Sequence, residues 1–416
     1  MRVGPPTQVS VFFMRRFSFV LLSLLVTALS WAQPSGWGRY RVKVETDKDA
    51  QRLADSSIPL FSEQISLGDV DVIVGPDHLV EFWKLGLKNA YVGELPRPDA
   101  WKDRVTSALD DYQTTYLQYA SMIGKYETWR AAYPSLVTRV RIGQGQPALA
   151  NDIWSYRIYA GTGEPRHSVI IIGGIHAREW ISPAVCMYLF RNLIEKINTD
   201  SSWALLMKRT ALHVIPSLNP DGYRYTWSTN RMWRKNRRNN GGGSYGVDLN
   251  RNWPVAWGGG GSSGSTGSDT YRGPSAASEP ETQALINHAS TLLNVSAFID
   301  FHSYGQYILW PWGYTSALCA DDADHRRVGL MMQSLIQAPS GSFYTAGPIT
   351  TTLYQASGNT VDYFYQTYRA RSYTIELRDT GVNGFLLPEA QIYPTQIEAW
   401  AGFERFLRLA GMRRIP

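Results

Sequence analysis

Five apolar stretches, separated by longer amphipathic segments, constrain the fold of this chain most strongly. They occupy residues 152–160, 168–174, 210–219, 295–304 and 371–379. Residues 182–197, between two of them, have the pattern of an amphipathic helix. Because strands that alternate with helices build α/β folds, we predict an α/β fold with a mostly parallel sheet. The chain has 416 residues, enough for a large core.

The residues before this region have a pattern of their own. Three stretches read as strands and two as helices: 39–46, 69–74 and 90–95 for the strands, 47–56 and 76–87 for the helices. A polar stretch with Arg97, Lys102 and Arg104 follows, where a trypsin-like protease could cut. We therefore predict a small α+β domain over residues 33–104 and a larger domain over residues 105–416.

The first 32 residues have the pattern of a secretory signal peptide. Arg15 and Arg16 precede an apolar run over residues 17–29, and Ser30 and Ala32 form a small-x-small cleavage site. The run is short for a membrane span, and no charged stop-transfer cluster follows it. We expect a secreted, extracellular protein with no membrane anchor. It has only two cysteines and can form at most one disulfide, so a large core must hold the fold.

The chain carries a net charge of +6, which could indicate an anionic partner. Much of the excess lies in one run over residues 231–238, so composition alone does not indicate a nucleic-acid ligand. We expect no nucleic-acid partner. A monomer is the expected state, because all the residues with recognisable chemistry lie in the larger domain.

Potential metal ligands follow two of the apolar stretches. His176 and Glu179 come directly after residues 168–174, and His302 lies at the end of residues 295–304. Taken alone, a His-x-x-Glu pair is often a surface pair on a helix. Two imidazoles and one carboxylate, however, leave a fourth position of a zinc ion open to water, as in catalytic sites. Such a site needs a base, and Glu376 lies inside an apolar strand; the alternative is a salt bridge to Arg378.

Seven ordered blocks carry a resemblance to a known family. They are GGIHAREWISP, NPDGY, RMWRKNRR, VDLNRNW, FHSYGQ, TTTLYQASGNTVDYFY and YTIELRDTGVNGFLLPEAQI. From about residue 109 to its end, the chain closely resembles the zinc metallocarboxypeptidases of the pancreatic carboxypeptidase A/B type. The resemblance implies a mixed, mostly parallel eight-stranded twisted sheet with helices on both faces. It also implies that residues 33–104 form an inhibitory pro-domain, a four-stranded open sandwich that a trypsin-like protease removes.

The resemblance implies a role for each matched residue. One Zn²⁺ per chain is held by His176, Glu179 and His302, Glu376 activates the zinc-bound water, and Arg234 polarises the scissile carbonyl. Asp248 orients a zinc-bound histidine. Asn250 and Arg251 bind the terminal carboxylate of a peptide or protein substrate, and Tyr354 closes over it. The residues matched to the outer subsites are Arg178, Arg231, Tyr304 and Phe385. Lys235, Arg237 and Arg238 are expected to be plain surface residues.

The same resemblance implies a pocket for the C-terminal side chain of the substrate. The matching positions are Val361 at its floor, with Leu309, Gly313, Ile349, Leu353, Ala356, Asn359 and Thr374. An acidic floor residue would select Lys or Arg, and Val361 is apolar, so we expect a preference for aromatic or branched aliphatic residues. Asn359 replaces a smaller residue and could narrow the pocket. Ser244 and Gly267 occupy the places of a family disulfide, so the glycine-rich loop between them could be more mobile.

Three other functions remain open from the sequence. A B-type enzyme would remove C-terminal Lys or Arg, which Val361 argues against. A catalytically inactive secreted relative would only bind peptides, but such relatives usually lose the base or a metal ligand, and all four residues are present here. A zinc amidase of cell-wall or acyl-amino-acid substrates is the third, and Asn250, Arg251 and Tyr354 favour a substrate with a free C-terminal carboxylate instead.

Overall fold

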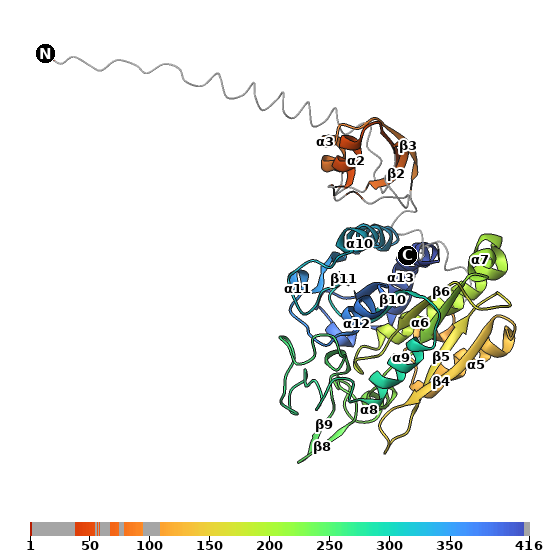
Figure 1. Ribbon diagram of the computed structural model, residues 1–416, viewed down its shortest axis with the longest axis vertical. Helices are drawn as coiled ribbons and strands as arrows, with labels where there is room; N and C mark the ends of the chain where they lie inside the picture. Colours follow the sequence, from red (N-terminus) through yellow and green to blue (C-terminus); the bar gives the residue numbers. More distant parts are fainter. Residues whose placement is uncertain are drawn as a thin grey trace.

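The computed structural model describes residues 1, 38–54, 56, 58, 67–74, 79–94 and 109–411. The expected signal peptide beyond residue 1, and the expected cleavage stretch at residues 95–104, lie outside the described residues. Figure 1 shows two groups of elements, a small sheet early in the chain and a large sheet with its helices.

The small sheet belongs to the segment predicted as α+β. Its elements are β1 (Gly38–Val44), α2 (Asp47–Ala54), β2 (Gly68–Val74), α3 (Leu79–Lys84) and β3 (Asn89–Glu94). The strand order is β2-β1-β3, antiparallel throughout. Alternate residues of β1 are buried in a core shared with α2 and α3, where Tyr40 contacts Phe82. Three strands of the expected four lie among the described residues.

The large sheet has eight strands in the order β12-β11-β13-β10-β6-β7-β5-β4. Their bounds are β4 (Val137–Gln144), β5 (Asp152–Ile158), β6 (His167–Ile172), β7 (Thr210–Ile215), β10 (Val295–Ser303), β11 (Tyr307–Trp310), β12 (Thr345–Pro348) and β13 (Arg371–Leu377). The four central strands β13, β10, β6 and β7 run parallel, and antiparallel pairings connect them to β11 on one side and β5 on the other. The predicted mixed, mostly parallel α/β sheet is therefore confirmed.

Helices cover both faces of this sheet (Figure 1). One face packs against α5 (Tyr119–Ala132), α6 (Ile181–Thr199), α10 (Asp322–Gln337) and α13 (Ile392–Ala410), and the other against α9 (Pro280–Ser290) and α12 (Thr360–Tyr368). The remaining helices are α4 (Asp111–Thr114), α7 (Ser201–Met207), α8 (Pro220–Ser228) and α11 (Ile349–Thr352). Strand β6 serves both cores, because Val169 and Ile171 face the first and Ile170 and Ile172 the second. Burial on both faces explains why the central strands are continuously apolar.

Candidate functional site

Three neighbouring parallel strands bring the predicted ligands and the predicted base together. His302 and Glu376 are direct partners in the ladder between β10 and β13. His176 and Glu179 lie in the turn after β6, which pairs with the other edge of β10. The carboxyl ends of parallel strands meet at one edge of a sheet, so residues far apart in sequence converge there.

The turn after β6 depends on a glycine and a serine. Gly174 has a φ of +60°, and a Cβ there would lie 2.8 Å from the Ser217 hydroxyl, so a side chain would be strained and would clash. The Ser182 hydroxyl accepts a hydrogen bond from the Gly174 amide at 3.0 Å and donates to the Glu179 carbonyl at 2.9 Å. Trp180 occupies the N-cap position of α6 but makes no side-chain capping bond, and Ser182 lies within the first turn of the helix.

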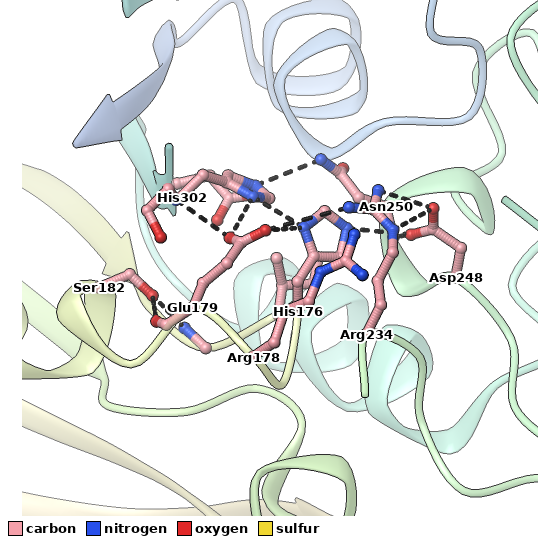
Figure 2. Close-up of polar contacts among 12 residues, drawn as sticks. His176, Arg178, Glu179, Ser182, Arg234, Asp248, Asn250 and His302 are labelled. Atoms are coloured by element: carbon pink, nitrogen blue, oxygen red, sulfur yellow. Dashed lines mark hydrogen bonds and ion pairs between the residues drawn. The ribbon is translucent and has the colours of Figure 1, made fainter. Parts of the chain in front are cut away.

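Figure 2 shows the side chains of His176, Glu179 and His302 converging. His176 Nδ1 lies 2.8 Å from Glu179 Oε1, His302 Nδ1 lies 3.0 Å from Glu179 Oε2, and the two Nδ1 atoms are 3.1 Å apart. All three residues are buried, and their ligand atoms lie within 4.8 Å of one another. Two imidazole nitrogens and one carboxylate facing a common point form a donor set that fits Zn²⁺.

Each imidazole ring also contacts a second carboxylate through its Nε2 atom. His176 Nε2 lies 3.1 Å from Asp248 Oδ1, and His302 Nε2 lies 2.9 Å from Asp300 Oδ2. Each bond leaves Nδ1 turned toward Glu179, the arrangement that fixes the tautomer of a metal-binding histidine. Asp300 was not among the predicted residues. Its position two residues before His302 in a strand, hence on the same face, was the available signal.

Neighbouring positive charges keep two of the buried acids, Glu179 and Asp248, ionised. Burial raises the pKa of Glu179, but the His176 and His302 rings outweigh it and the net shift is downward. Burial likewise raises the pKa of Asp248, and Arg234 and His176 lower it well below its usual range. Arg234 Nη2 bonds Asp248 Oδ2 at 2.9 Å, and its Nη1 lies 3.9 Å from Glu179 Oε1. The positive charge of these neighbours therefore keeps the Glu179 and Asp248 carboxylates ionised although both are buried.

Glu376 is in a different electrostatic environment. Burial raises its pKa to about 8, although the His302 ring opposes the shift. The alternative salt bridge to Arg378 is wrong, because Arg378 forms an ion pair with Glu398 and also bonds Gln391. A buried carboxyl whose affinity for protons is raised, beside a metal-type cluster, is suited to proton transfer.

The described residues enclose a cavity of about 300 Å³ above this cluster. Its lining residues are His176, Arg178, Glu179, Arg234, Asn250, Arg251, His302, Ser303, Tyr304, Leu309, Ile349, Leu353, Tyr354, Ala356, Asn359, Thr374, Glu376 and Phe385. All but Ser303 were predicted as site residues. Among the described lining residues, the acidic side chains are only those of Glu179 and Glu376.

The predicted carboxylate-binding residues lie at one side of the cavity. Arg251 is almost completely buried, with its guanidinium held by the carbonyls of Gly261 and Asn250 at 2.8 Å each. The Asn250 side-chain oxygen accepts the Thr360 amide at 3.0 Å, at the start of α12. The Tyr354 ring is half exposed and lies 5.9 Å from the Arg251 guanidinium. Arg251 is therefore fixed, whereas Tyr354 stands at the cavity mouth.

Two predicted pocket residues, Val361 and Gly313, do not line the cavity. Val361 is fully buried in the core cluster that contains Leu309, Ile349 and Ala356, so it lies behind the wall that these residues form. A Cβ on Gly313 would lie 2.5 Å from Asn359 Nδ2. The Asn359 side chain therefore fills the space beside Gly313 at this end of the cavity.

Asn359 caps α12 and is saturated with hydrogen bonds. Its Oδ1 accepts the Asp362 amide at 2.8 Å, and its Nδ2 donates to the Ala356 carbonyl at 2.7 Å and to Asp362 Oδ2 at 2.8 Å. Asp362 Oδ1 also accepts the Gly313 amide at 2.9 Å, so its carboxylate is turned away from the cavity. Asn359 thus occupies volume at the cavity wall but has no free amide group to offer.

Arg231 joins two loops at the cavity mouth instead of lining the cavity. It donates to the Arg178 carbonyl at 2.7 Å and to the Phe385 carbonyl at 2.6 Å, and its guanidinium lies 3.7 Å from the centre of the Trp180 ring. The Arg178 guanidinium in turn lies 4.1 Å from the centre of the Phe385 ring, which meets Tyr304 edge-on. Arg231 therefore acts on the cavity through its neighbours.

The expectation that Lys235, Arg237 and Arg238 are plain surface residues is wrong. Lys235 is 4% exposed, and its ammonium donates to the carbonyls of Thr266 and Ser268 at 2.9 Å each. It thereby anchors the glycine-rich loop at residues 266 and 268. Arg238 pairs with buried Glu279 at 3.1 Å, and Arg237 is stacked among aromatic rings. Cys186 and Cys319 are both free.

Among the described residues, no helix combines the length and apolarity needed to cross a membrane.

Comparison with known proteins places these features in context. Residues 123–402 match the family model described as zinc carboxypeptidase. A metallocarboxypeptidase A-like protein of Trichophyton verrucosum (strain HKI 0517) is 32% identical over 418 residues, covering 92% of this chain and 97% of the relative. Carboxypeptidase A4 of Mus musculus is 37% identical over 276 residues, covering 66% of this chain and 65% of the relative. The structure of bovine thrombin-activatable fibrinolysis inhibitor in complex with tick carboxypeptidase inhibitor has a TM-score of 0.65 at 32% identity, covering 72% of this chain and 97% of that one.

Proposed function

This chain belongs to the zinc carboxypeptidase family, and from that membership we propose that it is a secreted A-type enzyme made as an inactive precursor. It is a metallocarboxypeptidase, a peptide hydrolase that acts at the C-terminal residue. The observation that carries the finer proposal is the cavity of about 300 Å³, which joins the His176, Glu179 and His302 cluster to a mostly apolar wall.

His176, Glu179 and His302 would hold one Zn²⁺ per chain. Asp248 and Asp300, on the far nitrogens of the two rings, support this assignment because they hold both Nδ1 atoms toward Glu179. When bound, Zn²⁺ supplies a Lewis acid for the carbonyl and lowers the pKa of water.

Glu376 acts as the general base in the proposed mechanism. Its carboxylate takes a proton from the water that attacks the scissile carbonyl carbon, and then passes a proton to the amine that leaves as the C–N bond breaks. Its position supports both roles, because Glu376 lines the same cavity as the three proposed zinc ligands and pairs with His302 across adjacent strands. Arg234, held by Asp248 and directed toward the cavity, stabilises the oxyanion that forms on the carbonyl.

Asn250, Arg251 and Tyr354 recognise the free C-terminal carboxylate. A fixed guanidinium binds a carboxylate with little loss of entropy, and the burial of Arg251 supports that role. The exposed Tyr354 ring at the mouth is suited to cover the bound residue. Arg178, Tyr304 and Phe385 contact substrate residues further from the C-terminus, and Arg231 holds them in place.

The C-terminal side chain of the substrate enters the apolar end of the cavity. Leu309, Ile349, Leu353, Ala356 and Thr374 form that end, and no acid among the described lining residues lies there to pair with Lys or Arg. Val361 behind the wall also offers no charge, while the Asp362 carboxylate is occupied by the Gly313 amide and Asn359. These contacts support aromatic or branched aliphatic C-terminal residues over basic ones.

Secretion and precursor activation complete the proposal. Residues 1–32 are the signal peptide, residues 33–104 the pro-domain and residues 105–416 the enzyme. The small sheet with its own core supports a separate pro-domain.

The test is hydrolysis of paired peptides that end in Phe and in Arg. The purified precursor is assayed before and after limited trypsin treatment, with and without a zinc chelator. We expect release of Phe only after trypsin, and loss of this release with chelator. Release of Arg would refute the pocket assignment but would not affect the zinc-site assignment. Equal activity before and after trypsin would refute the proposal that the protein is made as an inactive precursor.

A further inference from the structure

A second cavity lies outside the catalytic site. It measures about 890 Å³ and shares no lining residue with the catalytic cavity. Its walls come from the turn between β4 and β5, from helix α8, from residues 237–245 and from the start of α9. Leu149, Pro147 and Pro280 form an apolar part of the wall, and Arg224, Arg237 and Arg238 a basic part.

Arg237 is held in place by rings alone. Its guanidinium lies 3.7 Å from the centre of the Tyr225 ring, 4.5 Å from that of Trp233 and 4.8 Å from that of Tyr245. Within the described part of the chain, no hydrogen bond or ion pair engages its N–H groups. Stacking restricts the side chain and leaves the edge of the guanidinium free, so the group is preorganised to bind an oxyanion with two parallel hydrogen bonds.

Arg224 provides a second free cation at the same cavity. It is exposed on α8 and also makes no hydrogen bond or ion pair with the residues that the structure describes. The third cation, Arg238, is already paired with buried Glu279 at 3.1 Å. The cavity thus presents two unpaired guanidinium groups.

Buried acids lie under this cavity, and protein donors satisfy them. Asp221 accepts the Gln146 amide at 2.5 Å and the Asn151 side chain at 2.6 Å. The Asn236 side chain donates to Glu279 at 2.8 Å and to Glu281 at 3.1 Å. Among the described residues, neither Arg224 nor Arg237 forms an ion pair with these acids, although Asp221 lies close enough to Arg224 to reduce the local positive potential.

We propose that this second cavity binds carboxylate side chains of an acidic peptide segment through Arg237 and Arg224. A peptide is favoured because the cavity combines free guanidinium groups with apolar walls and amide side chains, and because the protein is a peptide hydrolase. The site would then add affinity for protein substrates with an acidic segment away from the C-terminus. That consequence rests on the proposed function, but the binding itself does not.

The test measures binding of labelled peptides by fluorescence anisotropy at low salt. The probe is a peptide of alternating Glu and Leu with an amidated C-terminus, which the carboxylate-binding residues of the catalytic site cannot recognise. The same peptide with Gln in place of Glu is the ligand control. We expect the Glu peptide to bind at least about tenfold more tightly, and to weaken as salt screens the charges.

Arg224→Gln and Arg237→Gln should each weaken the Glu peptide by about tenfold to a hundredfold, since each removes charge-assisted hydrogen bonds. Arg157→Gln is the matched control, because Arg157 is also stacked on a tyrosine, 4.5 Å from the centre of the Tyr159 ring, and does not line the cavity. Arg224 is exposed, so its variant tests the site even where loss of Arg237 disturbs folding. Hydrolysis of a blocked dipeptide should be unchanged in both variants, which separates this site from catalysis.

Equal binding of the Glu and Gln peptides would overturn the proposal. An equal loss of affinity in Arg157→Gln would also overturn it, because that result would indicate an effect of net charge alone. Failure of the enzyme to release Phe would refute the proposed function without affecting either binding measurement.

Discussion

Replacement of Asn359 by glycine should widen the cavity end that receives the C-terminal side chain of the substrate. The Asn359 side chain fills the space beside Gly313, and all its polar atoms are used within the protein. Its removal therefore adds volume to the cavity without removing a hydrogen bond to the substrate. A difference of one methylene in such a pocket changes transition-state binding by about 1–3 kcal/mol, or roughly 10- to 200-fold. We expect the ratio of kcat/KM for a C-terminal Trp over a C-terminal Leu to rise by about tenfold.

The same replacement should lower stability. A glycine cap by itself costs only a few tenths of a kcal/mol. The Asp362 carboxylate, however, loses the donor at 2.8 Å and keeps the amides of Gly313 and Tyr314. Burial raises the pKa of Asp362 to about 7, so the carboxyl is only partly ionised near neutral pH, and we expect the free energy of unfolding to fall by about 1–2 kcal/mol.

Asn359→Ser separates the two effects, because serine is a good helix cap and is smaller than asparagine. The assay is hydrolysis of blocked dipeptides ending in Leu, Phe and Trp, beside chemical denaturation of each variant. If both variants are folded and the Trp-to-Leu ratio stays at the wild-type value, Asn359 does not limit the pocket and the reasoning fails.

Four further perturbations follow from the site and its surroundings. Glu376→Gln should lower kcat by about 10²- to 10⁴-fold while zinc content, measured by atomic absorption, stays at one per chain; retained activity would exclude Glu376 as the base. Removal of zinc by a chelator should lower the melting temperature by calorimetry, because a ligand that binds only the folded state stabilises it, and an unchanged value would contradict the assigned ligands. Arg231→Met should raise KM for tetrapeptides and leave KM for blocked dipeptides unchanged, because it removes the hydrogen bonds to the Arg178 and Phe385 carbonyls that hold the two loops. Equal effects on both substrates would indicate a general structural defect. Burial raises the pKa of Glu281 to about 8, so the protonated carboxyl contributes its full stabilisation below about pH 4.5, and this contribution is lost as pH rises through 8. Glu281→Gln should therefore reduce the fall in melting temperature over this pH range, and an unaltered pH dependence would refute the assignment.

The strands that position the site could be read from the sequence because burial on both faces gives them an uninterrupted apolar pattern. Strands β6, β10 and β13 were each predicted within a few residues of their bounds. The convergence of His176, Glu179 and His302 followed from parallel strands meeting at one edge. The apolar pattern and the sheet topology indicate the same arrangement there, so one amino-acid sequence was enough to predict it.

The partners of the basic run could not be read in this way. Lys235, Arg237 and Arg238 appear in the sequence as one cluster of charge, yet the chain turns each toward a different partner: two carbonyls of a distant loop, a set of rings and a buried acid. Similarly, Arg231 was expected to contact substrate, whereas it bonds two carbonyls at residues 178 and 385. Long-range contacts of this kind carry no local periodicity, so no pattern reveals them.

The pairing of His302 with Glu376 across adjacent strands has a wider consequence. The two side chains stand at the same rung of a ladder that is part of the central core, with no flexible segment between them. Their separation is therefore as rigid as the sheet, whereas the loops around the cavity can change in length without altering it. A one-residue insertion within either strand would turn one of the two groups into the opposite core. Substrate preference can thus vary with the loops, whereas catalysis requires that His302 and Glu376 remain paired across the two strands.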